Sequence, residues 1–567
     1  MQIRRAAGTG AAGVLTLALV LTGCGTGETE VTSESNEVPA VDVHPVNRKE
    51  LKQGGTLRWP ISEIPSQWNV AHLDGATVST AEVTDALLPS PFRFDEKANP
   101  TPNPDLVTSA KLTSDDPKQQ ITYELNPKAK WSDGEPISWK DFHHQWRAMS
   151  GQDQRFRGAA SEGYDRIEDV TKGENARQVV VTYSEPFGDW EAMFDPLLPK
   201  STTSDPNTFN EGWKDGVPVS AGPFRFGKVD EKAGTVTVTR DPKWWGSPAK
   251  LNAIEYRAIP TSEQLQAYEN GEIDFVTIGT NGAAYDSAKS TPRTDVRKAA
   301  APDYAVVTFN GSSPTLSDVN VRKAIALAVD RERIARSALS AVDYPVIPMQ
   351  NHFFVNTQDG YQDNAGDLAS PDPETAGELL NEAGWKLKKK KRVKDGEPLV
   401  IRFVSPEGSE RSKQVGTLMR EMLADVGVQL RVQEVPMEDF FDSYITAGNF
   451  DLAPSAWQGT PFPVSSARSI YAMPTKDARG DMVIQQNFSR IGSEQIDQLM
   501  DDAIDELDVS SARKQTNKAD QMIWDAVHSL PLYQQPQIRA VRHDLANFGA
   551  NGFQSVVYQD IGFVQGD

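Results

Sequence analysis

The sequence predicts an α/β protein that is divided into more than one sub-domain. Short segments of alternating apolar and polar residues, typical of strands, are interleaved with segments of helical periodicity, and this favours an α/β architecture over a sandwich or a bundle. The chain has 567 residues, more than one hydrophobic core usually supports. Its 38% hydrophobic and 24% charged residues are typical of a globular protein.

The N-terminus carries the sharpest local pattern. Arg4 and Arg5 precede an apolar run over residues 11–21, which is followed by Leu21-Thr22-Gly23-Cys24. This arrangement resembles a bacterial lipoprotein signal, in which a peptidase cuts before a cysteine that carries a lipid. It implies that residues 1–23 are a signal peptide and that Cys24 is the lipidation site. An ordinary signal peptide with an incidental cysteine is the alternative interpretation.

Residues 24–53 are expected to form a lipidated, flexible tether, because they are polar, acidic and nearly free of aromatic side chains. Beyond the tether, no segment approaches the roughly 18 apolar residues that span a bilayer, so we expect a soluble body. Cys24 is the single cysteine of the chain. A disulfide framework, a thiolate metal site and a cysteine nucleophile are therefore excluded.

Strands are predicted at residues 235–240, 399–404 and 428–435, where apolar residues alternate with polar ones. Asp318 is expected to cap one helix over residues 319–339, and Asp372-Pro373 to begin another that Gly384 ends. A third helix is expected from near Ser412 to Gly427. The basic run Lys388–Arg392 is interpreted as a solvated hairpin loop rather than as a binding patch.

The composition argues against several functions. A net charge of −21 disfavours nucleic acid as a partner, because binding to phosphates needs a concentrated positive field. The chain contains no P-loop, dinucleotide-binding turn, G-x-S-x-G elbow or HExxH motif. The adjacent His143 and His144 point to different sides of their expected helix, which disfavours a metal site there. Carboxylate pairs distant in the sequence stay invisible at this level, so catalysis is disfavoured but not excluded.

Several motifs, taken in order, resemble the extracytoplasmic solute-binding proteins of family 5, the dipeptide-, oligopeptide- and nickel-binding type. The most recognisable is KWSDGEPISWKDF, from Lys130 to Phe142, in which a Trp-x-Asp-Gly turn leads to a helix opened by Ser138. The others are GGTLRWP (54–60), GPFRFGKVD (222–230), VTRDPKWWG (238–246), AIPTSEQLQAYENGEIDFV (258–276), VRKAIALAVDRERIA (321–335), PDPETAGELLNEAGW (371–385), GVQLRVQEVPMEDFF (427–441) and GNFDLAPSAW (448–457).

This resemblance covers residues 54–567 and implies a two-lobed periplasmic-binding-protein fold of the large peptide-binding type, with an additional inserted sub-domain. By resemblance, residues 54–88, 219–312 and 535–567 form lobe I, residues 89–218 form the inserted sub-domain, and residues 313–534 form lobe II. Such proteins close by a hinge motion that buries the ligand.

The resemblance also implies a ligand site. The stretch Trp457-Gln458-Gly459-Thr460-Pro461-Phe462 is similar to the one that lines the cleft in this family, so Trp457, Gln458, Thr460 and Phe462 are expected to bind ligand. Trp68 and Asn69, after the first strand, are a second expectation for the cleft wall, with a buried tryptophan as the alternative.

The family's pattern is broken at two places. Thr460 stands where peptide-binding members place an aspartate that pairs with the peptide ammonium, and a threonine cannot supply that charge. No Lys or Arg occurs from Phe440 through Ala456, where a guanidinium meets the peptide carboxylate. Both differences point to a blocked, modified or uncharged solute, or to an acid elsewhere in the chain.

The function implied is capture of a peptide or peptide-like solute by a monomer that is lipid-anchored on the extracytoplasmic face of the membrane and delivers the solute to an ABC permease. No enzymatic activity, cofactor or metal is implied; nickel or haem gains little support from seven histidines. Two alternatives stay open. One is a repurposed fold that regulates envelope biosynthesis or signalling without transport, and the other is an extracytoplasmic hydrolase.

Overall fold

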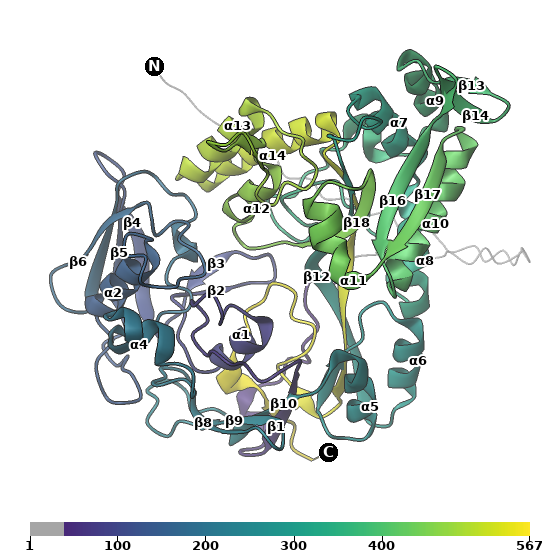
Figure 1. Ribbon diagram of the computed structural model, residues 1–567. Helices are drawn as coiled ribbons and strands as arrows, with labels where there is room; N and C mark the ends of the chain where they lie inside the picture. The colour runs from purple at the N-terminus through teal and green to yellow at the C-terminus, as the bar shows by residue number, and fades with distance from the viewer. Residues whose placement is uncertain (1–38, 567) are drawn as a thin grey trace, which may run out of the picture. The chain divides into compact units, whose positions relative to one another are not determined.

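The computed structural model describes residues 39–566, and the predicted signal peptide and Cys24 lie outside them. Its strands form three main sheets, two of which take their members from distant parts of the chain (Figure 1). The mixed α/β architecture that the sequence predicts is confirmed.

The first sheet has four strands in the order β1-β10-β9-β8. β1 runs parallel to β10, and the other neighbours are antiparallel. The predicted strand at residues 235–240 is β9, whose Val236 and Val238 are buried while the threonines that alternate with them are half-buried, as the alternation requires. The four strands are β1 (Thr56–Ile61), β8 (Phe224–Asp230), β9 (Thr235–Arg240) and β10 (Ala253–Ala258).

The second sheet has six strands in the order β11-β21-β12-β18-β16-β17. β12 and β21 are unusually long, and their pairing is interrupted by register shifts between Ala300 and Val306 of β12. Such a bulge bends a strand locally. The members are β11 (Phe275–Thr277), β12 (Thr294–Phe309), β16 (Val400–Pro406), β17 (Gln429–Val435), β18 (Leu452–Gln458) and β21 (Ser529–Arg542).

The third sheet, in the order β4-β5-β7-β6, lies within residues 89–218 and is accompanied by helix α2. Ser138 and Asp141 form a capping box at the start of α2, as expected for Ser138, and the indole N–H of Trp131 donates to Asp141 (3.0 Å). The elements are β4 (Val107–Ser114), β5 (Gln120–Leu125), β6 (Ile167–Lys172), β7 (Gln178–Tyr183) and α2 (Trp139–Met149), followed by α3 (Lys200–Thr203) and α4 (Pro206–Glu211).

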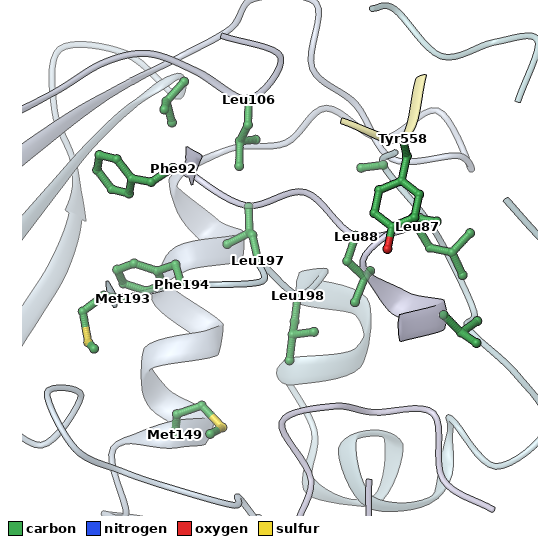
Figure 2. Close-up of a cluster of buried hydrophobic side chains, with 14 of the residues drawn as sticks. Leu87, Leu88, Phe92, Leu106, Met149, Met193, Phe194, Leu197, Leu198 and Tyr558 are labelled. Atoms are coloured by element: carbon green, nitrogen blue, oxygen red, sulfur yellow. The ribbon is translucent and has the colours of Figure 1, made fainter. Parts of the chain in front are cut away.

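One buried apolar cluster joins this sheet to the first one. Leu88, from the segment after helix α1, lies beside the ring of Tyr558 from the C-terminal segment, with Leu197 and Leu198 close by (Figure 2). Burial of apolar side chains from segments this far apart in the sequence is what fixes their relative positions.

The predicted helix starts are confirmed, but one predicted helix is divided. Asp318 caps α7, which ends at Ala328, and Asp330 then caps a separate helix, α8. Asp330 competes for the backbone N–H of Arg333, and this local bond ends the continuous helix that the apolar spacing suggested. The helices outside residues 89–218 are α1 (Val78–Thr84), α5 (Gln264–Glu269), α6 (Gly282–Ser290), α7 (Val319–Ala328), α8 (Arg331–Leu339), α9 (Pro373–Glu382), α10 (Glu410–Asp425), α11 (Met437–Asp439), α12 (Pro463–Tyr471), α13 (Glu494–Asp505) and α14 (Val509–Ala526), with a π-helical turn η6 (Phe440–Thr446).

The basic run forms a hairpin turn, and its lysines are exposed as expected, but Arg392 is buried and donates to the carbonyl of Val426 (2.9 Å). Lys389 and Lys390 have positive φ values of 47° and 69° and join β13 to β14. The remaining short strands are β2 (Phe92–Phe94), β3 (Pro100–Pro102), β13 (Lys386–Lys388), β14 (Lys391–Lys394), β15 (Glu397–Pro398), β19 (Thr475–Lys476), β20 (Met482–Val483), β22 (Leu545–Ala546) and β23 (Gly562–Phe563).

Residues 39–53, expected to belong to a flexible tether, pack on the C-terminal segment. Asp42 forms a β-bridge with Ala550, and Leu51 pairs with Val564 and is 1% exposed. Composition describes only local residues, and these contacts join positions about 500 residues apart in the sequence. Within residues 39–566, no helix combines the length and the hydropathy that crossing a membrane requires.

Candidate functional site

Strand β18 has one paired edge and one open edge. It pairs with β12 along its whole length, from Leu452 opposite Phe309 to Gln458 opposite Asp303. On its other side it touches β16 only where Leu452 lies opposite Phe403. Beyond Leu452, no described strand covers this second edge, and an uncovered edge is a template on which an extended chain can add as a further strand.

The alternation of the strand decides which main-chain groups face the open edge. The N–H of Gly459 donates to the carbonyl of Pro302 (3.0 Å), and the N–H of Asn310 donates to the carbonyl of Asp451 (2.9 Å). Odd-numbered residues of this stretch therefore bond to β12, and even-numbered ones turn their main-chain groups outward. The residues that face outward are Pro454, Ala456 and Gln458.

Trp457 forms one wall of an apolar cavity on one face of the sheet. Its ring is stacked on that of Phe488, with centroids 6.4 Å apart and planes 7° apart. The cavity has a volume of about 200 Å³, and Phe441 at its mouth is 56% exposed. It offers a place for one apolar side chain of a strand lying on β18. The other lining residues are Thr308, Phe440, Ile445, Ala453, Pro454, Ser455 and Ala456.

A second cavity, of about 160 Å³, lies on the opposite face of β18 and includes Arg411. Arg411 is in the first turn of α10, is exposed, and donates a hydrogen bond to the side-chain oxygen of Gln535. Ala456 and Tyr533 also line this cavity. Arg411 is thus a cation next to β18, although residues 440–456 contain none. It escaped the sequence analysis because it is far from Trp457 in the chain, and only the sheet order brings the two segments together.

The other residues expected after Trp457 lie around the end of β18. Gln458 is exposed. The Thr460 hydroxyl is 2.8 Å from that of Ser466, and its carbonyl accepts a hydrogen bond from Gln358 (2.9 Å). Phe462 precedes α12 and packs edge-on against Phe94, with ring centroids 5.8 Å apart. Thr460 therefore forms hydrogen bonds only with uncharged side chains, and its position provides no charge to a solute.

The second expectation, Trp68 and Asn69, falls in the core of this structure. Trp68 is 1% exposed and packs edge-on against Phe226 (5.1 Å). Asn69 is fully buried, and its amide donates to the carbonyl of Phe209 (3.0 Å). Both side chains are used in packing, so neither forms a wall that a solute reaches in this structure. The sequence could not decide this, because an aromatic residue after a strand suits both roles.

Together these features form a candidate binding site for an extended solute. Main-chain donors and acceptors along an open edge, flanked by small side-chain cavities on both faces, suit recognition of a strand-like chain. Among residues 39–566, no group of three or more His, Cys, Asp or Glu side chains is arranged to hold a metal ion.

Comparison with known proteins gives the family. The profile of the bacterial extracellular solute-binding proteins, family 5, matches residues 101–478. The oligopeptide-binding protein OppA of Mycobacterium tuberculosis (strain H37Rv) is 38% identical over 561 residues, which cover 97% of this chain and 93% of OppA. The probable monoacyl phosphatidylinositol tetramannoside-binding protein LpqW of the same organism is 28% identical over 59% of this chain and 52% of its own length.

Solved structures agree with this family. The periplasmic EDTA-binding protein EppA superposes with a TM-score of 0.82 at 25% identity, covering 94% of this chain and all of EppA. The oligopeptide-binding protein AppA of Bacillus subtilis, solved with a nonapeptide, gives 0.69 at 17% identity over 91% of this chain and all of AppA, a likeness of fold.

The chain belongs to the bacterial extracellular solute-binding proteins of family 5. It has their periplasmic-binding-protein fold and is a substrate-binding protein of the kind that serves ABC importers. The members of this family are binding proteins rather than enzymes, and they act outside the cytoplasm.

Proposed function

We propose that the protein binds a peptide or peptide-like solute along the open edge of β18 and delivers it to an ABC permease. The observation that carries this proposal is the edge itself, with the outward main-chain groups of Ala456 and Gln458 and a cavity on either face. Main-chain hydrogen bonds give affinity for any peptide, and the cavities select among side chains. OppA and AppA are named for oligopeptides, and that class of solute fits this edge.

In this proposal the solute is released unchanged, and Trp457, Gln458, Thr460 and Phe462 contact it. Residues 54–88, 219–312 and 535–567 form lobe I with residues 89–218 inserted, and residues 313–534 form lobe II. The chain acts as a monomer, held at the membrane by a lipid on Cys24.

Closure would depend on contacts between residues 89–218 and the helices α12 and α13. The Ser465 hydroxyl donates to Asp189 (2.6 Å), and the N–H of Gly188 donates to the carbonyl of Ile504 (2.6 Å). Lys97 pairs with Asp359 (2.9 Å) nearby in the fold. These bonds have to open for a solute to enter or leave, and the bulge in β12 between Ala300 and Val306 is where we place the bend.

Native mass spectrometry of the chain without residues 1–24, purified from its own host, tests this proposal. We expect a peptide or modified peptide to be retained and then released intact on denaturation. A Trp457→Ala variant should lose it, whereas Trp385→Ala, a half-buried tryptophan elsewhere, should not. If the wild-type chain retains nothing and no peptide library shifts its thermal midpoint, peptide capture is wrong. Docking to an envelope-biosynthetic or signalling protein would then be the function to pursue.

A further inference from the structure

One face of helix α1 carries two acidic residues. Ser79, Thr80, Val83 and Thr84 are buried. The opposite face carries Val78, Glu82 and Asp85, which are spaced about one helical turn apart. Val78 is 75% exposed. Asp85 is the residue that ends the helix and is exposed.

Asp85 lies in a recess with a second carboxylate, Asp195. Both line a cavity of about 220 Å³, and the hydroxyl of Ser90 donates to Asp195. Neither carboxylate forms an ion pair with any residue of 39–566. The charges that act on Asp85 are those of Asp195 and Glu82, both of the same sign. Part of the Asp85 side chain is exposed to solvent, but protein atoms surround the recess in which it lies. Desolvation by these atoms, and then the charges of Asp195 and Glu82, raise the pKa of Asp85 to about 7.

A tyrosine that is almost fully buried lines the same cavity. Tyr558 lines it and is 7% exposed, and no described residue forms a hydrogen bond with the Tyr558 hydroxyl. Its ring lies beside Leu88 (Figure 2). Burial, and then the charge of Asp85, raises the pKa of Tyr558 well above its usual value, so the hydroxyl stays protonated. The indole N–H of Trp244, which also lines the cavity, has no partner among the described residues.

This combination is unsatisfied as it stands. Arg93 also lines the cavity but pairs with Asp105 (2.6 Å), so Asp85 and Asp195 lie near one another without a paired cation, which is costly. The buried indole N–H of Trp244 without an acceptor is costly as well. A group that relieves both must be a cation attached to hydrogen-bond acceptors. At ~30 Å³ per water molecule, the cavity holds about seven waters, enough for one long basic side chain.

The recess is next to the proposed solute site. Phe94 lines the cavity, and its ring packs against Phe462 at the end of the stretch that follows Trp457. Thr460, where the family's aspartate is missing, lies two residues before Phe462. A solute on β18 therefore has an acidic recess close to the position where it lacks a charged partner.

We propose that the recess lined by Asp85 and Asp195 binds the ammonium or guanidinium group of a basic residue in the solute, so that the protein selects cationic peptides. This inference rests on the proposed function and names the class of peptide. The Tyr558 hydroxyl donates to a carbonyl of the same residue. Specificity for charge thus comes from lobe I, and affinity for the main chain from β18.

Calorimetry with two blocked peptides tests this inference, using the chain without residues 1–24. The probes are acetyl-Ala-Ala-Lys-Ala-Ala-amide and the same peptide with norleucine in place of lysine. We expect the wild-type chain to bind the lysine peptide about tenfold more tightly, the size of effect of a hydrogen bond to a charged group. The double variant Asp85→Asn/Asp195→Asn should bind both peptides equally, with the affinity for the norleucine peptide unchanged.

The control is Asp215→Asn/Glu231→Gln, which removes two exposed acids and the same net charge. It should keep the tenfold preference, and this separates the recess from the general field of an acidic protein. The amides keep the shape of the carboxylates, and the thermal midpoint checks folding. If both peptides bind the wild-type chain equally, the inference is wrong and the proposed function stands. If neither peptide nor any library member binds, the proposed function fails and takes the inference with it.

Discussion

The two sides of the proposed site differ in what they recognise. The β18 side presents main-chain groups and apolar side chains, with Thr460 neutral and Arg411 the charge that lines its cavities. The α1 side presents Asp85 and Asp195, and little that an extended main chain could pair with. A strand edge binds most peptides alike, because it pairs with their main chain. In our proposals, therefore, the β18 side provides affinity and the α1 side provides selectivity for charge.

The largest effect is expected on the β18 side, from Trp457→Ala. This change removes the aromatic wall of a cavity and its stacking on Phe488. Truncation of a buried aromatic anchor costs about 2 kcal/mol or more, so we expect affinity for peptides to fall about 30-fold, for charged and neutral peptides alike. Calorimetry measures it, with Trp385→Ala as the matched control. A loss confined to lysine peptides would mean that the two walls are not separate.

Ala456→Pro tests the main-chain edge at a residue that also lines both cavities, so its control has to change the side chain at the same position. Proline removes the outward N–H of residue 456 but leaves the bonds of its neighbours to β12, and Pro454 already occupies the equivalent position in this strand. One lost hydrogen bond and the bulk of the ring should weaken binding about tenfold. Ala456→Val, which adds bulk at the same position but keeps the N–H, should bind more tightly than Ala456→Pro. Equal binding by Ala456→Pro would show that the solute does not pair with this edge.

The acidic side should make binding depend on pH. Burial, Asp195 and Glu82 raise the pKa of Asp85 to about 7, and burial raises that of Glu82 to about 7 against the effect of Arg539. Lysine keeps its charge over this range, so affinity for lysine peptides should rise several-fold between pH 6 and pH 8 as the carboxylates ionise. Norleucine peptides should show no change, and a parallel change would place the titrating group elsewhere.

The raised pKa of Asp85 also makes the stability of the fold depend on pH. A carboxyl whose pKa is raised in the folded state favours folding when protonated, and this contribution is lost as pH rises from the unfolded pKa near 4 through about 7. Asp85→Asn should therefore raise the thermal midpoint at pH 8 and have less effect at pH 5. A lower midpoint at pH 8 would contradict the unpaired state of Asp85.

The smallest effect is expected from Thr460→Asp. A carboxylate here supplies the charge that the family resemblance led us to expect, but the position is half-buried and open to solvent screening. We expect about a threefold gain for peptides with a free N-terminus over acetylated ones, by analogy with partly exposed ion pairs. Calorimetry with the two forms of one peptide measures it. No gain would place the peptide N-terminus away from Thr460.

The sequence predicted the local structure better than the site. The strand at residues 235–240 and the caps at Asp318 and Asp372 depend on neighbours in the chain, and they were found where expected. The pair Asp85 and Asp195 depends on an approach of segments 110 residues apart, and nothing in either segment marks it. Family resemblance pointed to Trp457, whose role in binding stays a prediction.

The most direct test of the account is hydrogen exchange of the chain with and without saturating lysine peptide. Pairing of the peptide with β18 predicts slower exchange in Leu452–Gln458, and no change in β17 (Gln429–Val435), the outer strand of the same sheet. If exchange in residues 452–458 is unchanged while the peptide is bound, the solute does not lie on this edge and the central claim is wrong.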